Sequence, residues 1–375
     1  MAAEVSITWP QVLAWRMRRS LLDPLGNPSV LDIARRLCGV QAQVPSAAAL
    51  AIGVRQADPA AGAMDQALQA GDVMRTWAMR GTLHLLPPDD AGAYLALMAA
   101  GRSWEKASWV KTFGVTPDEM VRLTETIAEV LDDQVLTREE LVAAVGERLG
   151  HSDLEAELRS GWGAVLKPAA WQGALCNAPT DSNRVAFARP DRLLPTWKGL
   201  PEPDEAATVV IPAYLRAYGP ASAERFDTWL TRGTTRKATL RAWFAALDDQ
   251  LATVDVEGTS AYLLAEDVED LAATEPAEET AVHLLPAFDH YVLGPGTGAT
   301  EILAPARRKE ISRTAGWIAP VVISAGRVAG TWDPDKQDPT QLTIDLFEEA
   351  PSIPEEPLTA AVDRLATVQA ALDSE

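Results

Sequence analysis

The sequence is poor in the residues that disulfide-rich and membrane proteins require. Its 375 residues include two cysteines, Cys38 and Cys176, both among apolar neighbours and without metal-ligand spacing. Two cysteines exclude a disulfide framework and indicate reduced core residues of a cytoplasmic protein. No apolar run approaches the ~20 residues that span a bilayer. Because Arg16, Arg18 and Arg19 interrupt any apolar segment near the start, we also expect no signal peptide.

Signatures of common cofactor sites are also missing. The four histidines lack the spacing of a metal set, and there is neither a Walker motif nor a Gly-x-Ser-x-Gly elbow. Residues 294–299, GPGTGA, match the letter of the dinucleotide fingerprint. However, Pro305 blocks the long helix that would hold a pyrophosphate, and no strand–helix–strand unit surrounds the motif. We therefore expect no nucleotide cofactor and no metal.

Basic residues are outnumbered, with 33 Lys and Arg against 53 Asp and Glu and a net charge of -20. DNA-binding proteins usually carry a basic footprint. The imbalance is uneven along the chain. Residues 1–100 hold eight Arg and no Lys against eight acidic residues, whereas residues 333–375 hold eleven acidic residues against two basic ones. A surface that binds nucleic acid must therefore be confined to a part of the chain where basic residues are not outnumbered.

Length and patterning predict several packed units. With 47% hydrophobic and 23% charged residues, the composition is that of a globular protein of two to three units. The pattern predicts an α+β, mostly helical fold, with tandem winged-helix units arranged around a C-terminal β-rich unit. The expected divisions are residues 1–115 (helical or winged-helix), 116–195 (second winged helix), 205–265 (third winged helix) and 280–375 (β-rich with a final helix).

Apolar periodicity and capping residues predict the elements of these units. In the first unit we expect helices over 9–22, 46–56, 60–79 and 89–100 and a strand over 81–86. In the second we expect helices from Thr116 and Thr137, a third over 156–171, and wing strands 174–178 and 184–188. A linker, 195–208, precedes helices near 207–217, 222–230 and 239–247 and strands 251–258 and 261–266. The last unit is predicted to hold strands 282–286, 319–325 and 327–332, a hairpin turn at Ala325–Gly326, and a final helix, 357–373.

One short stretch, Gly39 to Pro45, has an unusual polar pattern. Ser29 and Asp32 predict the start of a helix that Gly39 ends, and Pro45 favours extended backbone before it. In an extended segment, residues two apart share a face. Gln41 and Gln43 would then aim two amides at one point, with Ala42 in the core. A pair of amides can orient a single water without titrating, although spacing alone equally describes polar residues on a helix-exit loop.

The wider sequence resembles a known family. VLDIARRLCGVQAQVPSAAALAIGVR and VMRTWAMRGTLHLLPPDD, and later LLPAFDHYVLGPGTG and RRKEISRTAGWIAPVVISAGRVAGTW, are similar to the AlkZ-like DNA glycosylases. These are bacterial winged-helix proteins whose founding member protects an azinomycin producer from its own DNA crosslinker. Their Gln-apolar-Gln motif matches Gln41-Ala42-Gln43, and a sister branch with Gln-apolar-Asp does not match.

The resemblance implies a function. Gln41 and Gln43 would be catalytic in a monofunctional glycosylase that hydrolyses the N-glycosidic bond of bulky N7-alkylated purines in double-stranded DNA. It would serve repair of alkylation damage or interstrand crosslinks, or self-resistance to a genotoxic natural product, as a monomer away from membranes. The alternative is a non-catalytic winged-helix regulator or a drug-sequestering resistance protein, which the acidic balance favours slightly.

Basic residues gather at three places that are candidates for DNA contact. Each group has a structural alternative, namely ion pairing with nearby acidic residues or, for His84, a satisfied strand histidine. Asp289 and His290 form a further candidate, an acid–base pair at a strand end. The DNA-contact candidates are Arg75, Arg80 and His84; Arg232, Arg236, Lys237 and Arg241; and Arg307, Arg308 and Arg313.

Overall fold

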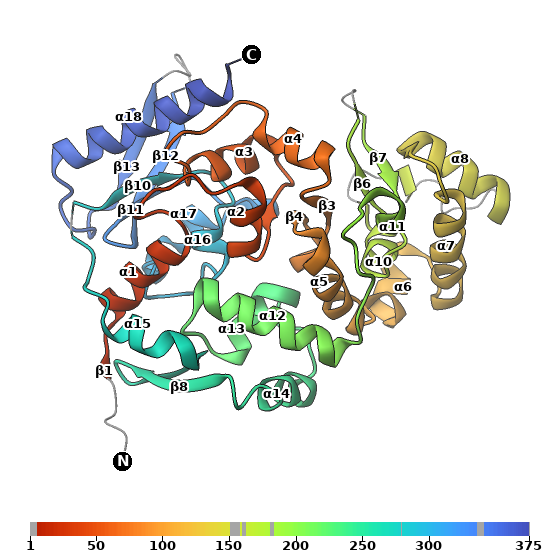
Figure 1. The fold of residues 1–375 in the computed structure, drawn as a ribbon, viewed down its shortest axis with the longest axis horizontal. Coiled ribbons are helices and arrows are strands. Elements are labelled where there is room, and N and C mark those ends of the chain that lie inside the picture. Colours follow the sequence, from red (N-terminus) through yellow and green to blue (C-terminus); the bar gives the residue numbers. More distant parts are fainter. Residues whose placement is uncertain are drawn as a thin grey trace. The chain divides into compact units, whose positions relative to one another are not determined.

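A computed structural model describes residues 6–150, 158–159, 163–180, 184–278, 280–335 and 341–374. The fold is α+β and mostly helical, as predicted (Figure 1). The chain forms two compact units, the first made of Met1–Met64, Ile211–Trp229 and Lys237–Glu375 and the second of Asp65–Val210 and Leu230–Arg236. Within the described ranges, none of the helices combines the length and apolar character needed to cross a membrane.

The first unit begins with three helices that follow the predicted pattern. They are α1 (Trp9–Arg19), α2 (Val30–Arg36) and α3 (Pro45–Gly53), and the short strand β2 (Val40–Gln41) lies between the last two. Ser29 caps α2 because its hydroxyl accepts from the Asp32 N–H at 3.1 Å while the Asp32 carboxylate accepts from the Ser29 N–H. The reciprocal bonds satisfy two amides that the helix itself leaves without partners.

One prediction for α1 is wrong. The apolar pattern of residues 9–22 predicts Arg16 on the outer face of this helix together with Arg18 and Arg19, but the Arg16 side chain is buried. Its Nη1 lies 3.2 Å from Glu301 Oε1, and its Nε and Nη2 donate to the carbonyls of Gly219 and Pro220. A buried guanidinium is tolerated here because its charge is paired with Glu301 and each of its three nitrogens donates a hydrogen bond.

The middle of the chain builds the three-helix and two-strand plan predicted for the third winged helix. The helices are α12 (Pro203–Tyr218), α13 (Ala223–Thr231) and α14 (Lys237–Ala245). The antiparallel hairpin of β8 (Leu251–Val256) and β9 (Thr259–Leu264) follows, and β1 (Ser6–Ile7) adds to β8 in parallel. Helix α12 begins inside the expected linker, because Pro203 and the acidic residues Asp204 and Glu205 suit a first helical turn. The short helix α15 (Val268–Ala272) lies in the acidic stretch 266–279, where the sequence predicts a surface helix or a linker.

A four-stranded antiparallel sheet forms the C-terminal part of the first unit, in the order β10-β11-β12-β13. Its strands are β10 (Val282–Leu285), β11 (Val321–Ser324), β12 (Arg327–Pro334) and β13 (Leu342–Leu346), the last of which was not predicted. The predicted turn is confirmed, since Ala325 and Gly326 both have positive φ. The final helix, α18 (Glu355–Leu372), packs against β10 and α3 (Figure 1).

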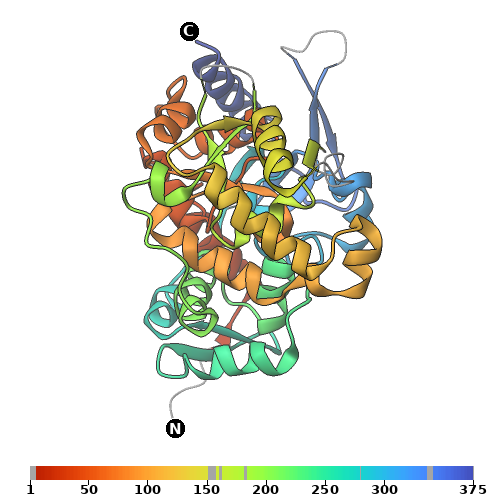
Figure 2. The same cartoon turned by 90° about the vertical axis from the view of Figure 1, so that its right-hand side faces the viewer.

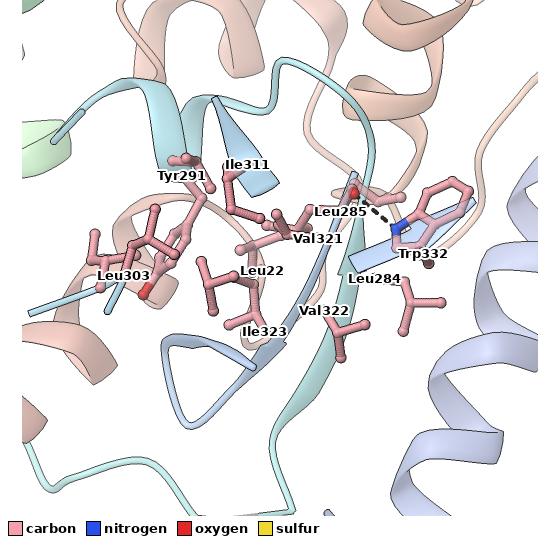
Figure 3. Packing of buried hydrophobic residues seen from close by; sticks show 14 of the residues in the cluster. Leu22, Leu284, Leu285, Tyr291, Leu303, Ile311, Val321, Val322, Ile323 and Trp332 are labelled. Atoms are coloured by element: carbon pink, nitrogen blue, oxygen red, sulfur yellow. Dashed lines mark hydrogen bonds between the residues drawn. The ribbon is translucent and has the colours of Figure 1, made fainter. Parts of the chain in front are cut away.

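This sheet carries the main apolar core of the first unit. Figure 3 shows Leu284, Val322 and Ile323 of the sheet together with Leu22 and Tyr291. The Trp332 indole donates to the Leu285 carbonyl at 2.9 Å, so the single polar atom of that side chain is satisfied inside the core. Tyr291 belongs to the short helix α16 (His290–Leu293), which is therefore anchored in the core.

The second unit contains a sheet whose strands lie in the order β4-β3-β6-β7-β5. Strands β6 (Cys176–Ala178) and β7 (Ala186–Ala188) are the predicted wing, and β5 is Leu136–Thr137. Helices α7 (Pro117–Val130) and α8 (Arg138–Leu149) begin at the predicted capping boxes and pack together (Figure 2). The remaining helices are α5 (Pro88–Ala100), α6 (Ala107–Phe113), α10 (Leu166–Trp171) and α11 (Pro190–Leu193). Part of the predicted third helix, 156–171, and of the wing turn lies outside the described residues.

The helix predicted over 60–79 is wrong in its second half. Helix α4 covers only Ala63–Ala70, and β3 (Met74–Trp77) pairs with β4 (Leu83–Leu86). Gly71, with φ +74°, ends the helix. The pairing of residues 74–77 with a later strand then overrides their local helical pattern.

Candidate active site

The glutamine segment is not helical: Gln41 ends β2, and residues 42–44 connect this strand to α3. Ala42 is 2% exposed, which confirms that it points into the core. Gln41, at the end of β2, is 7% exposed, whereas Gln43 is exposed. Helix α3 begins at Pro45 with Val44 as its extended N-cap residue. The predicted break in helical structure between α2 and α3 is therefore confirmed.

Two left-handed residues separate the end of α2 from the segment. Cys38 has φ +54° and Gly39 has φ +102°, and the Gly39 N–H donates to the Ala34 carbonyl at 2.7 Å. Glycine reaches this conformation at little steric cost, which explains its position here. The sharp turn changes the direction of the chain just before Gln41.

Two buried side chains from distant parts of the chain hold this segment by its backbone. The His290 Nε2 accepts a hydrogen bond from the Gln41 N–H at 2.8 Å. The Tyr218 hydroxyl donates to the Leu37 carbonyl at 2.5 Å, and its oxygen lies 3.3 Å from His290 Nδ1. Desolvation by burial raises the pKa of Tyr218 well above its usual value, so the hydroxyl stays protonated.

Asp289 and His290 were predicted as a candidate acid–base pair; both are buried, and their side chains bind different partners. The Asp289 carboxylate caps α16 by accepting from the Tyr291 N–H at 2.8 Å. Both of its oxygens also accept from Arg55, at 2.7 and 2.8 Å. Arg55 further donates to the carbonyls of Ser20 and Ala51. The arginine follows α3, so this ion pair ties the far end of α3 to α16.

Arg75, Arg80 and His84 lie in or beside β3 and β4 of the second unit. Desolvation lowers the pKa of His84 to about 3, with a further contribution from Arg80, so this ring is neutral near pH 7. It is fully buried, and its Nδ1 lies 2.9 Å from the Thr82 carbonyl. These facts favour the structural alternative for His84. Arg75 and Arg80 are half-buried, and burial lowers the pKa of Arg75.

The second basic group fits DNA contact better. Arg232, Arg236, Lys237 and Arg241 are all exposed. Within the part of the chain that the structure describes, none of the four forms an ion pair like the one that joins nearby Arg225 to Glu301. The nearby acidic residues therefore do not neutralise these four side chains by ion pairing, and the four positive charges face solvent.

The third basic group is largely engaged with acidic residues. Arg307 pairs with Glu310 and Glu349 and lies over the Phe347 ring at 4.8 Å. Arg313 lies 3.7 Å from Asp333, and Arg308 reaches the Thr297 hydroxyl at 3.4 Å. This arrangement favours the structural alternative for Arg307 and Arg313 and leaves Arg308, which is exposed, as a candidate.

The glutamine segment carries two neutral side-chain amides, those of Gln41 and Gln43, and its backbone is held by His290 and Tyr218. Such amides can orient a nucleophile but cannot act as strong bases. Among the residues that the structure describes, no three His, Cys, Asp or Glu side chains lie together in a way that could hold a metal ion. Sequence reasoning missed Tyr218 and Arg55. Their contacts join residues 181 and 234 positions apart, and no local pattern announces such pairs.

Comparisons with known proteins agree with one another. Residues 34–368 match the family described as DNA glycosylase AlkZ-like. A curated protein of Streptomyces sahachiroi, described as an interstrand DNA cross-link repair glycosylase, is 49% identical over 348 residues, 92% of each chain. The solved structure of Streptomyces sahachiroi DNA glycosylase AlkZ superposes with a TM-score of 0.91 at 46% identity, covering 96% of this chain and 97% of that one.

Proposed function

The chain belongs to the AlkZ-like DNA glycosylase family, and from this premise we propose that it hydrolyses the N-glycosidic bond of bulky N7-alkylated purines. It is a DNA glycosylase of DNA repair, and its substrate is DNA. We extend the proposal to interstrand crosslinks, because the curated relative of 49% identity is described as a cross-link repair glycosylase. Such an activity serves genome repair or self-resistance to a genotoxic natural product in the bacterial cytoplasm.

The chemistry of the substrate explains why two glutamines suffice. A purine alkylated at N7 already carries positive charge, so it leaves without a general acid. The transition state resembles an oxocarbenium ion, and the remaining task is to place a water against C1′ of the sugar. Positioning of this kind contributes ~7–11 kcal/mol in the best systems. Gln41 and Gln43 are proposed to hold that water, without the desolvation cost of a carboxylate.

The proposed reaction is monofunctional. Bifunctional glycosylases form a Schiff base through an amine, but residues 1–100 contain no lysine. Water is therefore the nucleophile, and the product is an abasic site in an otherwise intact strand. We propose that the protein acts as a monomer, with Arg232, Arg236, Lys237 and Arg241 contacting the DNA backbone.

The observation that carries this proposal is the Gln-Ala-Gln motif in a chain that matches a repair glycosylase over 92% of its length. The test uses duplexes with N7-methylguanine or with a nitrogen-mustard crosslink between guanine N7 atoms, followed by alkaline cleavage at abasic sites. Gln41→Ala and Gln43→Ala should each slow excision by ~10²-fold, as loss of one oriented transition-state hydrogen bond does elsewhere. Gln250→Ala, at an exposed glutamine, is the matched control.

The non-catalytic alternative predicts a different result. A regulator or drug-sequestering protein would shift the mobility of the duplex without producing alkali-sensitive sites. If the wild-type protein gives no strand breaks with either substrate, or if both glutamine variants excise at the wild-type rate, the proposed mechanism is wrong.

A further inference from the structure

We propose that His290 is a positioning residue for catalysis, and that Tyr218 holds it in the single tautomer that can bind the backbone of Gln41. The inference rests on the proposed catalytic role of Gln41. It assigns a function to two residues that lie far from the glutamine motif in sequence and do not contact the water themselves.

The contact with Gln41 determines which ring nitrogen of His290 carries hydrogen. A backbone N–H can only donate, so the Nε2 that lies 2.8 Å from the Gln41 nitrogen must present its lone pair. A neutral imidazole with a free Nε2 carries its hydrogen on Nδ1. A charged ring would place an N–H against the Gln41 N–H.

Tyr218 requires the same tautomer on independent grounds. Its hydroxyl has one hydrogen, and the 2.5 Å contact with the Leu37 carbonyl is where that hydrogen goes, since a carbonyl can only accept. The Tyr218 oxygen is then left to accept, and His290 Nδ1 lies 3.3 Å from it. Two contacts on opposite sides of the ring thus agree on one neutral form, with hydrogen on Nδ1.

The groups around the ring keep it in place. Asp289 and Arg55 fix the start of α16, where His290 is the first residue. Gly294 lies against the flat face of Tyr218, where a Cβ would stand 2.2 Å from a ring carbon. His290 and Tyr218 are each about 1% exposed, so solvent does not compete for these hydrogen bonds.

Loss of the His290 acceptor acts on catalysis through geometry. It leaves the buried N–H of Gln41 without its partner, and a buried amide then moves to find another. The carboxamide of Gln41 moves with its backbone. Displacement of a positioning group by about 1 Å is enough to cost ~10²-fold in rate.

The first experiment compares His290→Phe with His283→Phe in single-turnover excision of the N7-methylguanine duplex. His283 is a matched control, because it is a half-buried histidine of the same unit whose Nε2 has no hydrogen-bond partner. We expect His290→Phe to slow excision by ~10²-fold with its Kd for the duplex within twofold of the wild type. The control should keep the wild-type rate. Equal rates for the two variants would overturn the proposal.

The second experiment determines the protonation of the ring in the folded wild-type protein and uses a variant only to assign the signals. Side-chain nitrogen shifts of the wild-type protein, labelled with ¹⁵N in histidine, distinguish the two neutral tautomers from the charged ring. We expect two histidines in the neutral form with hydrogen on Nδ1, because the Nδ1 of His84 also lies 2.9 Å from a carbonyl, and we expect His290→Phe to remove one of these two sets of signals. A charged ring or hydrogen on Nε2 at pH 7 would overturn the proposal.

A third comparison separates this inference from the proposed function. If His290 acts through Gln41, then Gln41→Ala combined with His290→Phe should be no slower than Gln41→Ala alone. Full additivity would overturn the role of His290. A wild-type rate in Gln41→Ala would instead overturn the catalytic role of Gln41, whereas a slow Gln41→Ala beside a fast His290→Phe would overturn the positioning role alone.

Discussion

Arg55 and Asp289, which are 234 residues apart in sequence, form a bidentate ion pair. Their side chains are 0% and 1% exposed. A buried charge that loses its partner is strongly destabilising, because neither water nor another charge replaces it. Arg55→Met and Asp289→Asn should each lower the free energy of unfolding by about 3–5 kcal/mol in urea denaturation.

The double variant provides the test of this reading. Arg55→Met combined with Asp289→Asn leaves no unpaired charge and should be less unstable than the two single effects added together. Arg102→Met is the control, since its pair with Glu105 is exposed and should contribute less than ~1 kcal/mol. If the destabilisation of the double variant equalled the sum of the two single effects, the interpretation as a buried ion pair would be wrong.

Gly294 is predicted to be required for packing against Tyr218. A Cβ at this position would lie 2.2 Å from a ring carbon of Tyr218, whose ring is buried. We expect Gly294→Ala to destabilise the protein by about 1–3 kcal/mol and to slow base excision. Gly298→Ala lies in the same loop with nothing within 4 Å of its Cβ and should behave like the wild type. Equal melting temperatures of the two variants would show that the ring can shift.

Glu301 is predicted to make stability depend on acid pH. Burial alone would raise its pKa, but the hydrogen bond from Arg225 and the charges of Arg16 and Arg225 outweigh this and lower the pKa to about 2. Because the folded pKa lies below the unfolded value of 4.5, the stabilisation is complete above about pH 4.5 and is lost as the pH falls toward 2. Urea denaturation from pH 7 to 3 should show a steeper loss for the wild type than for Glu301→Gln. If the free energy of unfolding of the two proteins fell equally with pH, the lowered pKa of Glu301 would be contradicted.

Phosphate contact by the exposed basic group can be measured through its salt dependence. Each phosphate contact that is lost should reduce the slope of log K against log salt by about 1. We therefore expect Arg236→Gln and Arg241→Gln to weaken duplex binding and to flatten this dependence. Arg307→Gln removes an arginine already paired with Glu349 and should leave the slope unchanged. An unchanged slope in the first two variants would place the DNA elsewhere.

Local signals in the sequence predicted the helix starts well. The boxes at Ser29, Thr116 and Thr137 each involve a partner three residues away, so the sequence contains the whole interaction. The helix predicted over 60–79 failed because β3 is stabilised by pairing with β4, and that pairing is invisible in the local pattern.

In the candidate site too, local interactions were predicted from the sequence and long-range contacts were not. The break in helical structure around the two glutamines was predicted from Gly39 and Pro45, which act on their immediate neighbours. Asp289 and His290 were identified as a pair because they are adjacent, but their side chains reach different partners, Arg55 and Gln41. Tyr218 could not be found, because nothing near it in the sequence indicates that it caps the end of α2.

The long sequence separation between Gln41 and His290 also determines when the glutamine segment acquires its support during synthesis. A ribosome completes Gln41 early, but the ring that binds its amide is added 249 residues later. The nascent chain therefore carries its glutamine motif without this hydrogen bond until residue 290 of the 375 has been added and has left the ribosome.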